Sequence, residues 1–331
     1  MMKRCGSGWI VGVMLLGVLA GMPSGPATAQ TKLMVASPQA VLLDTGLVFG
    51  VAKEKGFFKE VGLDVDTVIV SGGGENVQAV VSGSVQIALA TGPFAVMSAF
   101  QKGAPVKILS AEMTGTRDMY WYSLANSPYR KMEDLAGKRV AFTAPGSSSH
   151  QAVLALVDQF KARGLAAPQP MALGRIPDIF TSIKTGQAEA GFAVPPLFMD
   201  RVEKGEIQIV LRGEEIEKLR DVTIRVNFAN ADWVEKNPET VRAFFRAYSK
   251  TLDFMLENRA ETAKIWIRHG KLNLSEATVL KAIDFYTRAS LAFKPVKGIP
   301  IIVEDGIKFN FLKQPLTQAE MERLIDLRYV P

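Results

Sequence analysis

The sequence predicts an α/β protein made of two related lobes, each a mostly parallel sheet flanked by helices. Short apolar segments alternate with helical patterns in each half of the chain, as is typical of parallel sheets. In addition, the stretch that starts at Ser71 aligns without gaps with the stretch that starts at Gly174, 103 residues later. One long doubly wound domain with a chance similarity is the alternative, and the gapless match favours two lobes.

The repeated stretch has the same pattern in both copies. Gly83 aligns with Gly186 and Pro93 with Pro196, and apolar residues recur at matching positions between them. Each copy therefore predicts a helix that ends at a glycine, a short apolar strand and a loop that contains proline.

The segments before the repeat also correspond. Leu33–Ser37 and Arg139–Ala144 are apolar and are each followed by proline, so we expect a strand at both places. Helical patterns follow at Leu47–Val61 and Gln151–Arg163, and both run into a Gly-Leu pair. Each half is therefore expected to form strand–helix–strand–helix–strand.

Two crossings between the lobes are expected, near residues 112–122 and near residues 212–226. The first contains Tyr120, Trp121 and Tyr122, which predict an extended aromatic strand, and the second leads into a strand over Thr223–Ala229.

The region after the second crossing is expected to be helical. Asn237-Pro238-Glu239 combines a cap, a first-turn proline and an acid at the positive end of the helix dipole. Thr317 and Glu320 form a capping box for the last helix. We expect these C-terminal helices to return to the first lobe.

The first 29 residues resemble a secretory signal peptide. Lys3 and Arg4 precede a 14-residue apolar run over Trp9–Met22, and Ala27-Thr28-Ala29 has the form of a cleavage site. A membrane anchor is the alternative, but the run is shorter than the ~20 apolar residues that a span needs. We therefore expect a mature, periplasmic protein that begins at Gln30.

The composition of the mature chain excludes several kinds of chemistry. The sole cysteine of the full sequence, Cys5, lies before the expected cleavage site, so the mature chain has none. Disulfides, cysteine nucleophiles and thiolate metal sites are therefore excluded. Removal of Lys3 and Arg4 lowers the formal net charge from +6 to +4, and the surplus is spread along the chain rather than clustered as in nucleic-acid-binding proteins. Two histidines without a paired spacing leave no metal motif.

The segment Gly146-Ser147-Ser148-Ser149-His150 allows two interpretations, a nucleophile with its base or a set of hydrogen-bond donors. It lacks the second glycine of G-x-S-x-G, and neighbouring side chains on a first helical turn diverge. The turn follows a parallel strand, where open α/β sheets bind ligands, and a helix N-terminus exposes unpaired N–H groups. A small-anion cradle is favoured, and a plain serine N-cap remains the alternative.

The first lobe offers a counterpart in Ser71-Gly72-Gly73-Gly74, which precedes a helix. Three glycines cost chain entropy, which favours close approach of the backbone to a ligand over a simple turn. No G-K-[ST] follows, so this is not a Walker loop. Glu75 either interacts favourably with the positive end of the helix dipole or attracts an amino group of a ligand.

Several segments in this order resemble a known family. They include Gly56-Phe57-Phe58-Lys59-Glu60-Val61-Gly62-Leu63, the glycine loop, Asp134-Leu135-Ala136-Gly137-Lys138-Arg139-Val140-Ala141, Pro145-Gly146-Ser147 and Asn237-Pro238-Glu239. Together they resemble the periplasmic substrate-binding proteins of ABC importers, in the group that binds nitrate, sulfonate, taurine and thiamine precursors. The resemblance covers nearly the whole mature chain.

This resemblance implies the two-lobed type II periplasmic binding protein fold, with two hinge strands and a ligand in the cleft between the lobes. The signal peptide would be 1–29, the first lobe 30–115 with 220–331, and the second lobe 116–219. It implies a monomer that captures a small organic or anionic solute and delivers it to a membrane permease, without catalysis, cofactor, metal or nucleic acid. A secreted enzyme on the same fold, a hydrolase or one like the thiamine-pyrimidine synthases, is the alternative.

Carried over by position, the resemblance implies ligand contacts from both lobes and the first crossing. The departure at Met113–Arg117 from the family pattern leaves the contact at the crossing open. The expected ligand-binding residues are Ser37, Pro38, Gln39, Gly72, Gly73, Gly74, Thr91, Gly92, Pro93, Trp121, Gly146, Ser147, Ser148, Ser149, Val194 and Pro195.

Overall fold

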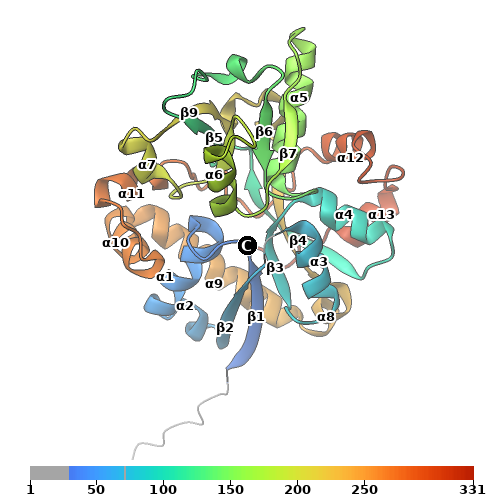
Figure 1. The fold of residues 1–331 in the computed structure, drawn as a ribbon. Helices are drawn as coiled ribbons and strands as arrows, with labels where there is room; N and C mark the ends of the chain where they lie inside the picture. The colour runs from blue at the N-terminus through green and yellow to red at the C-terminus, as the bar shows by residue number, and fades with distance from the viewer. Residues whose placement is uncertain (1–29, 71) are drawn as a thin grey trace, which may run out of the picture.

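The computed structural model describes residues 30–70 and 72–331 (Figure 1). The expected signal peptide and Ser71 lie outside the described residues. The strands are β1 Thr31–Ser37, β2 Leu63–Ile69, β3 Ile87–Thr91, β4 Val106–Thr114, β5 Tyr120–Leu124, β6 Arg139–Phe142, β7 Gln169–Ala172, β8 Gly191–Ala193, β9 Ile207–Arg212 and β10 Thr223–Asn230.

Helices cover the sheets and form the C-terminal region. The α-helices are α1 Val48–Lys55, α2 Phe57–Glu60, α3 Gly73–Val81, α4 Pro93–Gln101, α5 Ser148–Ala162, α6 Ile176–Lys184, α7 Met199–Glu203, α8 Ala231–Lys236, α9 Pro238–Glu257, α10 Arg259–Gly270, α11 Glu276–Ile283, α12 Ile299–Lys308 and α13 Gln318–Leu324. Short π- or 3-10 turns are η1 Leu43–Leu47, η2 Met132–Leu135, η3 Gly213–Glu215 and η4 Glu217–Leu219.

The strands form two groups, sheet A in one and sheets B and C in the other. Sheet A has the order β2-β1-β3-β10-β4, with β10 antiparallel to both of its neighbours. Sheet B (β8-β5-β9) and sheet C (β6-β7) are joined by a bridge between Val140 and Ala190, which gives the order β7-β6-β8-β5-β9. Sheet A occupies the lower part of Figure 1 and sheets B and C the upper part. The fold is α/β, as predicted.

The two orders correspond strand for strand. The repeat accounts for this: α3 spans residues 73–81 and α6 spans 176–184, which is the offset of 103 residues found in the sequence. Both helices end before a glycine with positive φ, Gly83 or Gly186, and both lead into a short strand. The predicted succession of strand, helix, strand, helix and strand is confirmed in each half.

The expected helix over Leu47–Val61 is wrong in detail. Gly56 adopts a φ of 76°, which ends α1 and starts α2, and a π-turn precedes both helices. Left-handed backbone is readily accessible to glycine, so this residue divides the segment. The predicted strand over Arg139–Ala144 ends two residues earlier, at Phe142.

The C-terminal helices contact more of the molecule than expected. Helix α9 packs on α1 and α2 beside sheet A, as predicted for a return to the first half of the chain. However, Thr278 of α11 bonds Glu203 of α7 at 2.7 Å, and Lys308 of α12 bonds Asp158 of α5 at 2.7 Å. The helices therefore link the two groups of strands. The predicted capping box of Thr317 and Glu320 is confirmed at α13.

Candidate functional site

A cavity of about 350 Å³ lies between sheet A and the sheet B and C group. This volume is within the range of small-molecule sites. Ten of the residues expected to bind a ligand line it, and they come from both groups of strands. They are Pro38, Gln39, Gly72, Gly73, Thr91, Gly92, Ser147, Ser148, Ser149 and Val194.

Six expected residues lie outside the lining. They are Ser37, Gly74, Pro93, Trp121, Gly146 and Pro195. Trp121 is completely buried in β5, where its indole N–H donates to the carbonyl of Ala141 at 2.8 Å. Ser37 donates to the carbonyl of Thr45 at 2.6 Å. The structure thus places both side chains in packing and hydrogen bonding away from the cavity, contrary to the expectation.

Further lining residues were not among the expected contacts. One group could have been found, because Gly174, Arg175 and Ile176 align with Ser71, Gly72 and Gly73 in the repeat. Glu75, left ambiguous by the sequence, also lines the cavity. The additional residues are Leu42, Glu75, Asn76, Ala90, Thr143, Ala144, Gly174, Arg175, Ile176, Phe192 and Arg225.

Three helices begin at the cavity, namely α3, α5 and α6. Their first N–H groups lack partners within the helix, so the cavity is bordered by donors and by the positive ends of helix dipoles. The two halves approach closely here, since a Cβ added at Gly92 would lie 2.3 Å from the carbonyl oxygen of Gly146. Glycine at position 92 is therefore required for this contact.

The three serines at the start of α5 have different roles. Ser147 caps the helix by accepting from the backbone N–H of His150 at 3.1 Å, as the N-cap alternative predicted. Ser147 and Ser149 also form a hydroxyl ring with Thr143, with all three oxygens 3.0 Å apart. Ser148 instead accepts from Nε of Arg225 at 3.2 Å. Its own proton has no acceptor among the hydrogen bonds of the described residues.

His150 is unable to act as a base for these serines. Its Nδ1 accepts from the backbone N–H of Gly146 at 3.1 Å, so the ring proton resides on Nε2 in the neutral form. The ring stacks on Phe142 with centroids 4.1 Å apart. Burial lowers the pKa of His150 to about 4, which keeps it neutral at physiological pH. The nucleophile interpretation therefore lacks a base.

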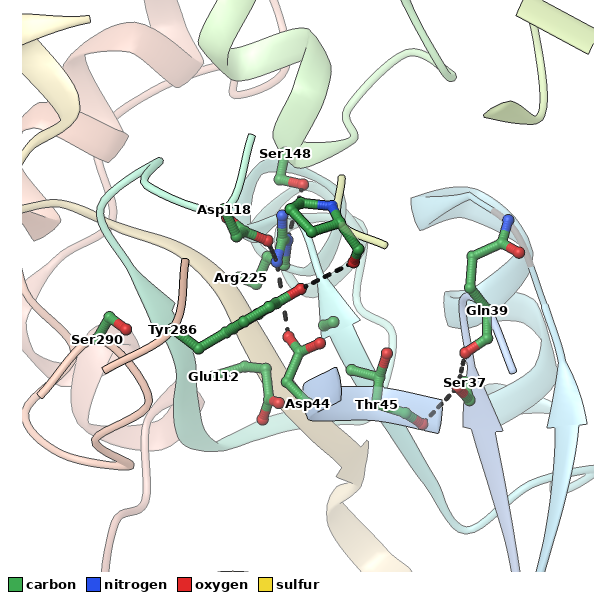
Figure 2. Close-up of polar contacts among 12 residues, drawn as sticks. Ser37, Gln39, Asp44, Thr45, Glu112, Asp118, Ser148, Arg225, Tyr286 and Ser290 are labelled. Atoms are coloured by element: carbon green, nitrogen blue, oxygen red, sulfur yellow. Dashed lines mark hydrogen bonds and ion pairs between the residues drawn. The ribbon is translucent and has the colours of Figure 1, made fainter. Parts of the chain in front are cut away.

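Arg225 on β10 connects the cavity with a buried cluster of carboxyl groups (Figure 2). Its Nη1 donates to Asp118 at 2.6 Å and lies 3.6 Å from Asp44. Burial alone would lower the pKa of Arg225, but the two carboxylates outweigh it and raise the pKa. The same guanidinium bonds Ser148, so it joins sheet A, the first crossing and the start of α5.

A second part of the cluster lies around Glu112. Its carboxyl group bonds the hydroxyl of Tyr248 at 2.6 Å and the side-chain amide of Asn227. Burial, reinforced by the charge of Asp44, raises the pKa of Glu112 to about 8. Burial likewise raises the pKa of Asp44 to about 6, against the attraction of Arg225. Glu112 is therefore mostly protonated at neutral pH.

The described residues offer no site for a metal ion and no helix able to cross a bilayer. Within residues 30–70 and 72–331, no three histidine, cysteine, aspartate or glutamate side chains are arranged to hold a metal. No helix in these ranges is long and apolar enough to span a membrane.

A cavity between two similar α/β units, bordered by helix N-termini, is typical of a protein that binds a small molecule. The solved structures agree on the fold. The aliphatic sulphonate binding protein SsuA of Escherichia coli superposes with a TM-score of 0.68 at 17% identity, over 89% of this chain and 92% of that one. The nitrate-binding protein NrtA of Synechocystis PCC 6803 gives 0.66 at 15%, over 92% and 87%.

The chain belongs to the NMT1/THI5-like family, which matches residues 46–262. The taurine-binding periplasmic protein of Escherichia coli (strain K12) is 27% identical over 58% of this chain and 57% of its own length. The formylaminopyrimidine-binding protein of Halalkalibacterium halodurans is 26% identical over 65% and 64%. The match thus spans less than two thirds of either curated relative. Both curated relatives are named as binding proteins, in agreement with the predicted binding role.

Proposed function

We propose that this protein captures a small organic or anionic solute in the cavity and delivers it to the permease of an ABC importer. The cavity itself carries the proposal, because its lining comes from both groups of strands and includes the starts of α3, α5 and α6. Membership of the NMT1/THI5-like family and the binding roles of the named relatives support it.

Capture would take place by closure of two lobes, residues 30–115 with 220–331 and residues 116–219. Within residues 30–70 and 72–331, the chain passes from one group of strands to the other twice, between β4 and β5 and between β9 and β10. Such links are suited to hinge motion. Small-angle scattering should show a smaller radius of gyration at saturating solute, and an unchanged radius would contradict closure.

Export to the periplasm is part of the proposal. The amino-terminal pattern up to Ala29 and the periplasmic location named for the taurine-binding relative support it. Sequencing of the exported protein should find Gln30 as the first residue. A start before Trp9 would contradict cleavage.

The binding test is a thermal-shift screen of small acids, sulfonates and pyrimidines, because a solute that binds only the folded state raises Tm. Ser148→Ala should weaken binding roughly fivefold to hundredfold if its hydroxyl contacts the solute. Ser147→Ala is the matched comparison and should cost about 1 kcal/mol of stability through the lost cap. If no compound in the screen shifts Tm, the proposed function is contradicted.

A further inference from the structure

Arg225 bonds side chains from both groups of strands, close to where the chain crosses between them (Figure 2). It lies on β10, the first strand after the second link, whereas Asp118 lies in the first link, between β4 and β5. Its Nη1 donates to Asp118 at 2.6 Å, and its Nε donates to Ser148 at the start of α5 at 3.2 Å. One guanidinium therefore connects sheet A, the first link and the start of α5.

The guanidinium is held in a fixed orientation. Arg225 and Asp118 are both almost completely buried, and a bond between two buried ions is strong. The donors of arginine form a rigid, planar fork, so the bond from Nη1 to Asp118 also sets the direction of Nε. Ser148 is only half-buried. We therefore expect the bond from Arg225, rather than packing, to orient its hydroxyl group.

This bond leaves the hydroxyl proton of Ser148 available. A hydroxyl has one proton and two lone pairs, and Oγ of Ser148 accepts from Arg225, so its proton is directed away from the guanidinium. Ser148 lines the cavity, and its proton has no acceptor among the hydrogen bonds of the described residues. Ser147 and Ser149 differ, because their hydroxyl groups bond each other and Thr143 at 3.0 Å.

We infer that Arg225 is a positioning residue, which directs the hydroxyl proton of Ser148 into the cavity, where it donates to an acceptor atom of the solute. The guanidinium does not bind the solute, because its charge is matched by Asp118 at 2.6 Å and by Asp44 at 3.6 Å. An opening that moves α5 away from sheet A would break the bond to Ser148, so the same bond couples solute binding to closure. This inference rests on the proposed solute-binding function and deepens it.

Unfolding without any solute tests the bond between Arg225 and Ser148. Arg225→Lys keeps a cation beside Asp118 but lacks the fork that reaches Ser148. Ser148→Ala should lower the denaturant midpoint of the original protein and leave that of Arg225→Lys unchanged, because substitutions at two bonded residues are not additive. Additive shifts would overturn the inference.

A measurement on Ser148→Ala alone decides the bond if Arg225→Lys fails to fold. The Nε–H proton of Arg225 should exchange with water more slowly in the original protein than in Ser148→Ala, as measured by ¹⁵N NMR. Equal exchange rates would overturn the inference.

Calorimetry tests the donation to a solute. The probe is whichever of propionate, ethanesulfonate and pyrimidine binds most tightly, since each presents an acceptor. Ser148→Ala and Arg225→Lys should each weaken binding roughly five- to hundredfold, and the double variant should bind within about twofold of the weaker single variant. Ser148→Thr keeps the hydroxyl and should bind within about threefold of the original protein.

Arg175→Lys is the control for the exchange of arginine for lysine. Arg175 also lines the cavity, but it bonds Asp178 at 3.1 Å and makes no bond to Ser148. Its effect on affinity, whatever its size, should therefore multiply with that of Ser148→Ala.

The outcomes separate this inference from the proposed function. If Arg225→Lys loses binding while Ser148→Ala keeps full affinity, the guanidinium binds the solute directly and the inference is overturned. Losses that multiply in the double variant would also overturn it, and both results leave the proposed function intact. If none of the three compounds binds the original protein, the result counts against the proposed function and against the donation with it, whereas unfolding still decides the bond between Arg225 and Ser148.

Discussion

Strands β10 and β5 occupy equivalent places in the two groups of strands but differ in chemistry. Each is the antiparallel strand of its group, with β10 between β3 and β4 and β5 between β8 and β9. Strand β10 buries Arg225 and Asn227, whereas β5 buries Tyr120, Trp121 and Tyr122. The two strands thus share one topology, but their side chains give them different roles. Arg225 of β10 lines the cavity, whereas the three aromatic residues of β5 are buried in a hydrophobic core.

The largest effect should follow from Arg225→Met on β10. This change leaves Asp118 and Asp44 buried without their cation, which should cost about 3–5 kcal/mol of unfolding free energy. Denaturant unfolding at pH 7.5 measures it. Arg246→Met is the control, because Arg246 is exposed on α9, and it should change stability by less than about 0.5 kcal/mol. A similar loss of unfolding free energy in both variants would mean that the ion pairs of Arg225 with Asp118 and Asp44 add no specific stability.

The difference between these strands also marks the limit of sequence-based prediction. Polar and apolar residues alternate along β10, with Thr223, Arg225 and Asn227 as the polar ones. This pattern normally indicates a strand with one face exposed to solvent. The structure buries both faces, because the polar side chains find hydrogen-bond partners elsewhere in the fold. Arg225 bonds Asp118 and Ser148, and Asn227 bonds Glu112. Local pattern carries no information about these partners, so Arg225 was missed.

The opposite error occurred in β5. Aromatic residues at a crossing resemble ligand contacts as much as core, and Trp121 was expected to bind. By contrast, two elements that depend on local signals were predicted well: the repeat and the capping box at Thr317. The loops that follow β1, β3 and β6 line the cavity through Pro38, Gly92 and Ala144, as the topology of an open α/β sheet leads one to expect.

Trp121→Phe should sharpen the comparison by separating stability from binding. The indole N–H would no longer reach the carbonyl of Ala141, and the smaller ring would leave a gap, so a loss of about 2–3 kcal/mol is expected. Because Trp121 does not line the cavity, solute affinity measured by calorimetry should stay within about twofold of the original. A tenfold weaker affinity would restore Trp121 to the binding site.

The pH dependence of stability should report Glu112, which bonds Asn227 of β10. Burial raises the pKa of Glu112 to about 8, so between its ordinary pKa and 8 the folded state binds more protons than the unfolded state. Stability should therefore fall as pH rises, by up to about 1.4 kcal/mol per pH unit, or about 2 kcal/mol from pH 6.5 to 8. Asp44, with a pKa of about 6, has mostly titrated below this window.

Glu112→Gln isolates this contribution. The neutral amide has no proton to lose between pH 6.5 and 8, so the slope of unfolding free energy against pH should become close to flat. Urea unfolding at several pH values in this window gives the slope. An unchanged slope in the variant would assign the dependence to another group.

The smallest effect is expected at Tyr122 on β5. Its hydroxyl is buried and has no hydrogen-bond partner among the described residues, and burial raises the pKa of this group well above its ordinary value. Tyr122→Phe removes a polar atom that gains nothing from the fold, so the unfolding free energy should change by less than about 0.5 kcal/mol or rise slightly. Tyr248→Phe is the matched comparison, because that hydroxyl bonds Glu112 and the carbonyl of Asp44, both at 2.6 Å. Its loss leaves the carbonyl of Asp44 and the carboxyl group of Glu112 without this buried partner and should cost about 1–3 kcal/mol. If the two variants unfold at the same denaturant concentration, the hydroxyl of Tyr248 adds no more to the free energy of unfolding than that of Tyr122. The polar cluster beside β10 and the aromatic core of β5 would then not differ in the stability that these hydroxyl groups provide.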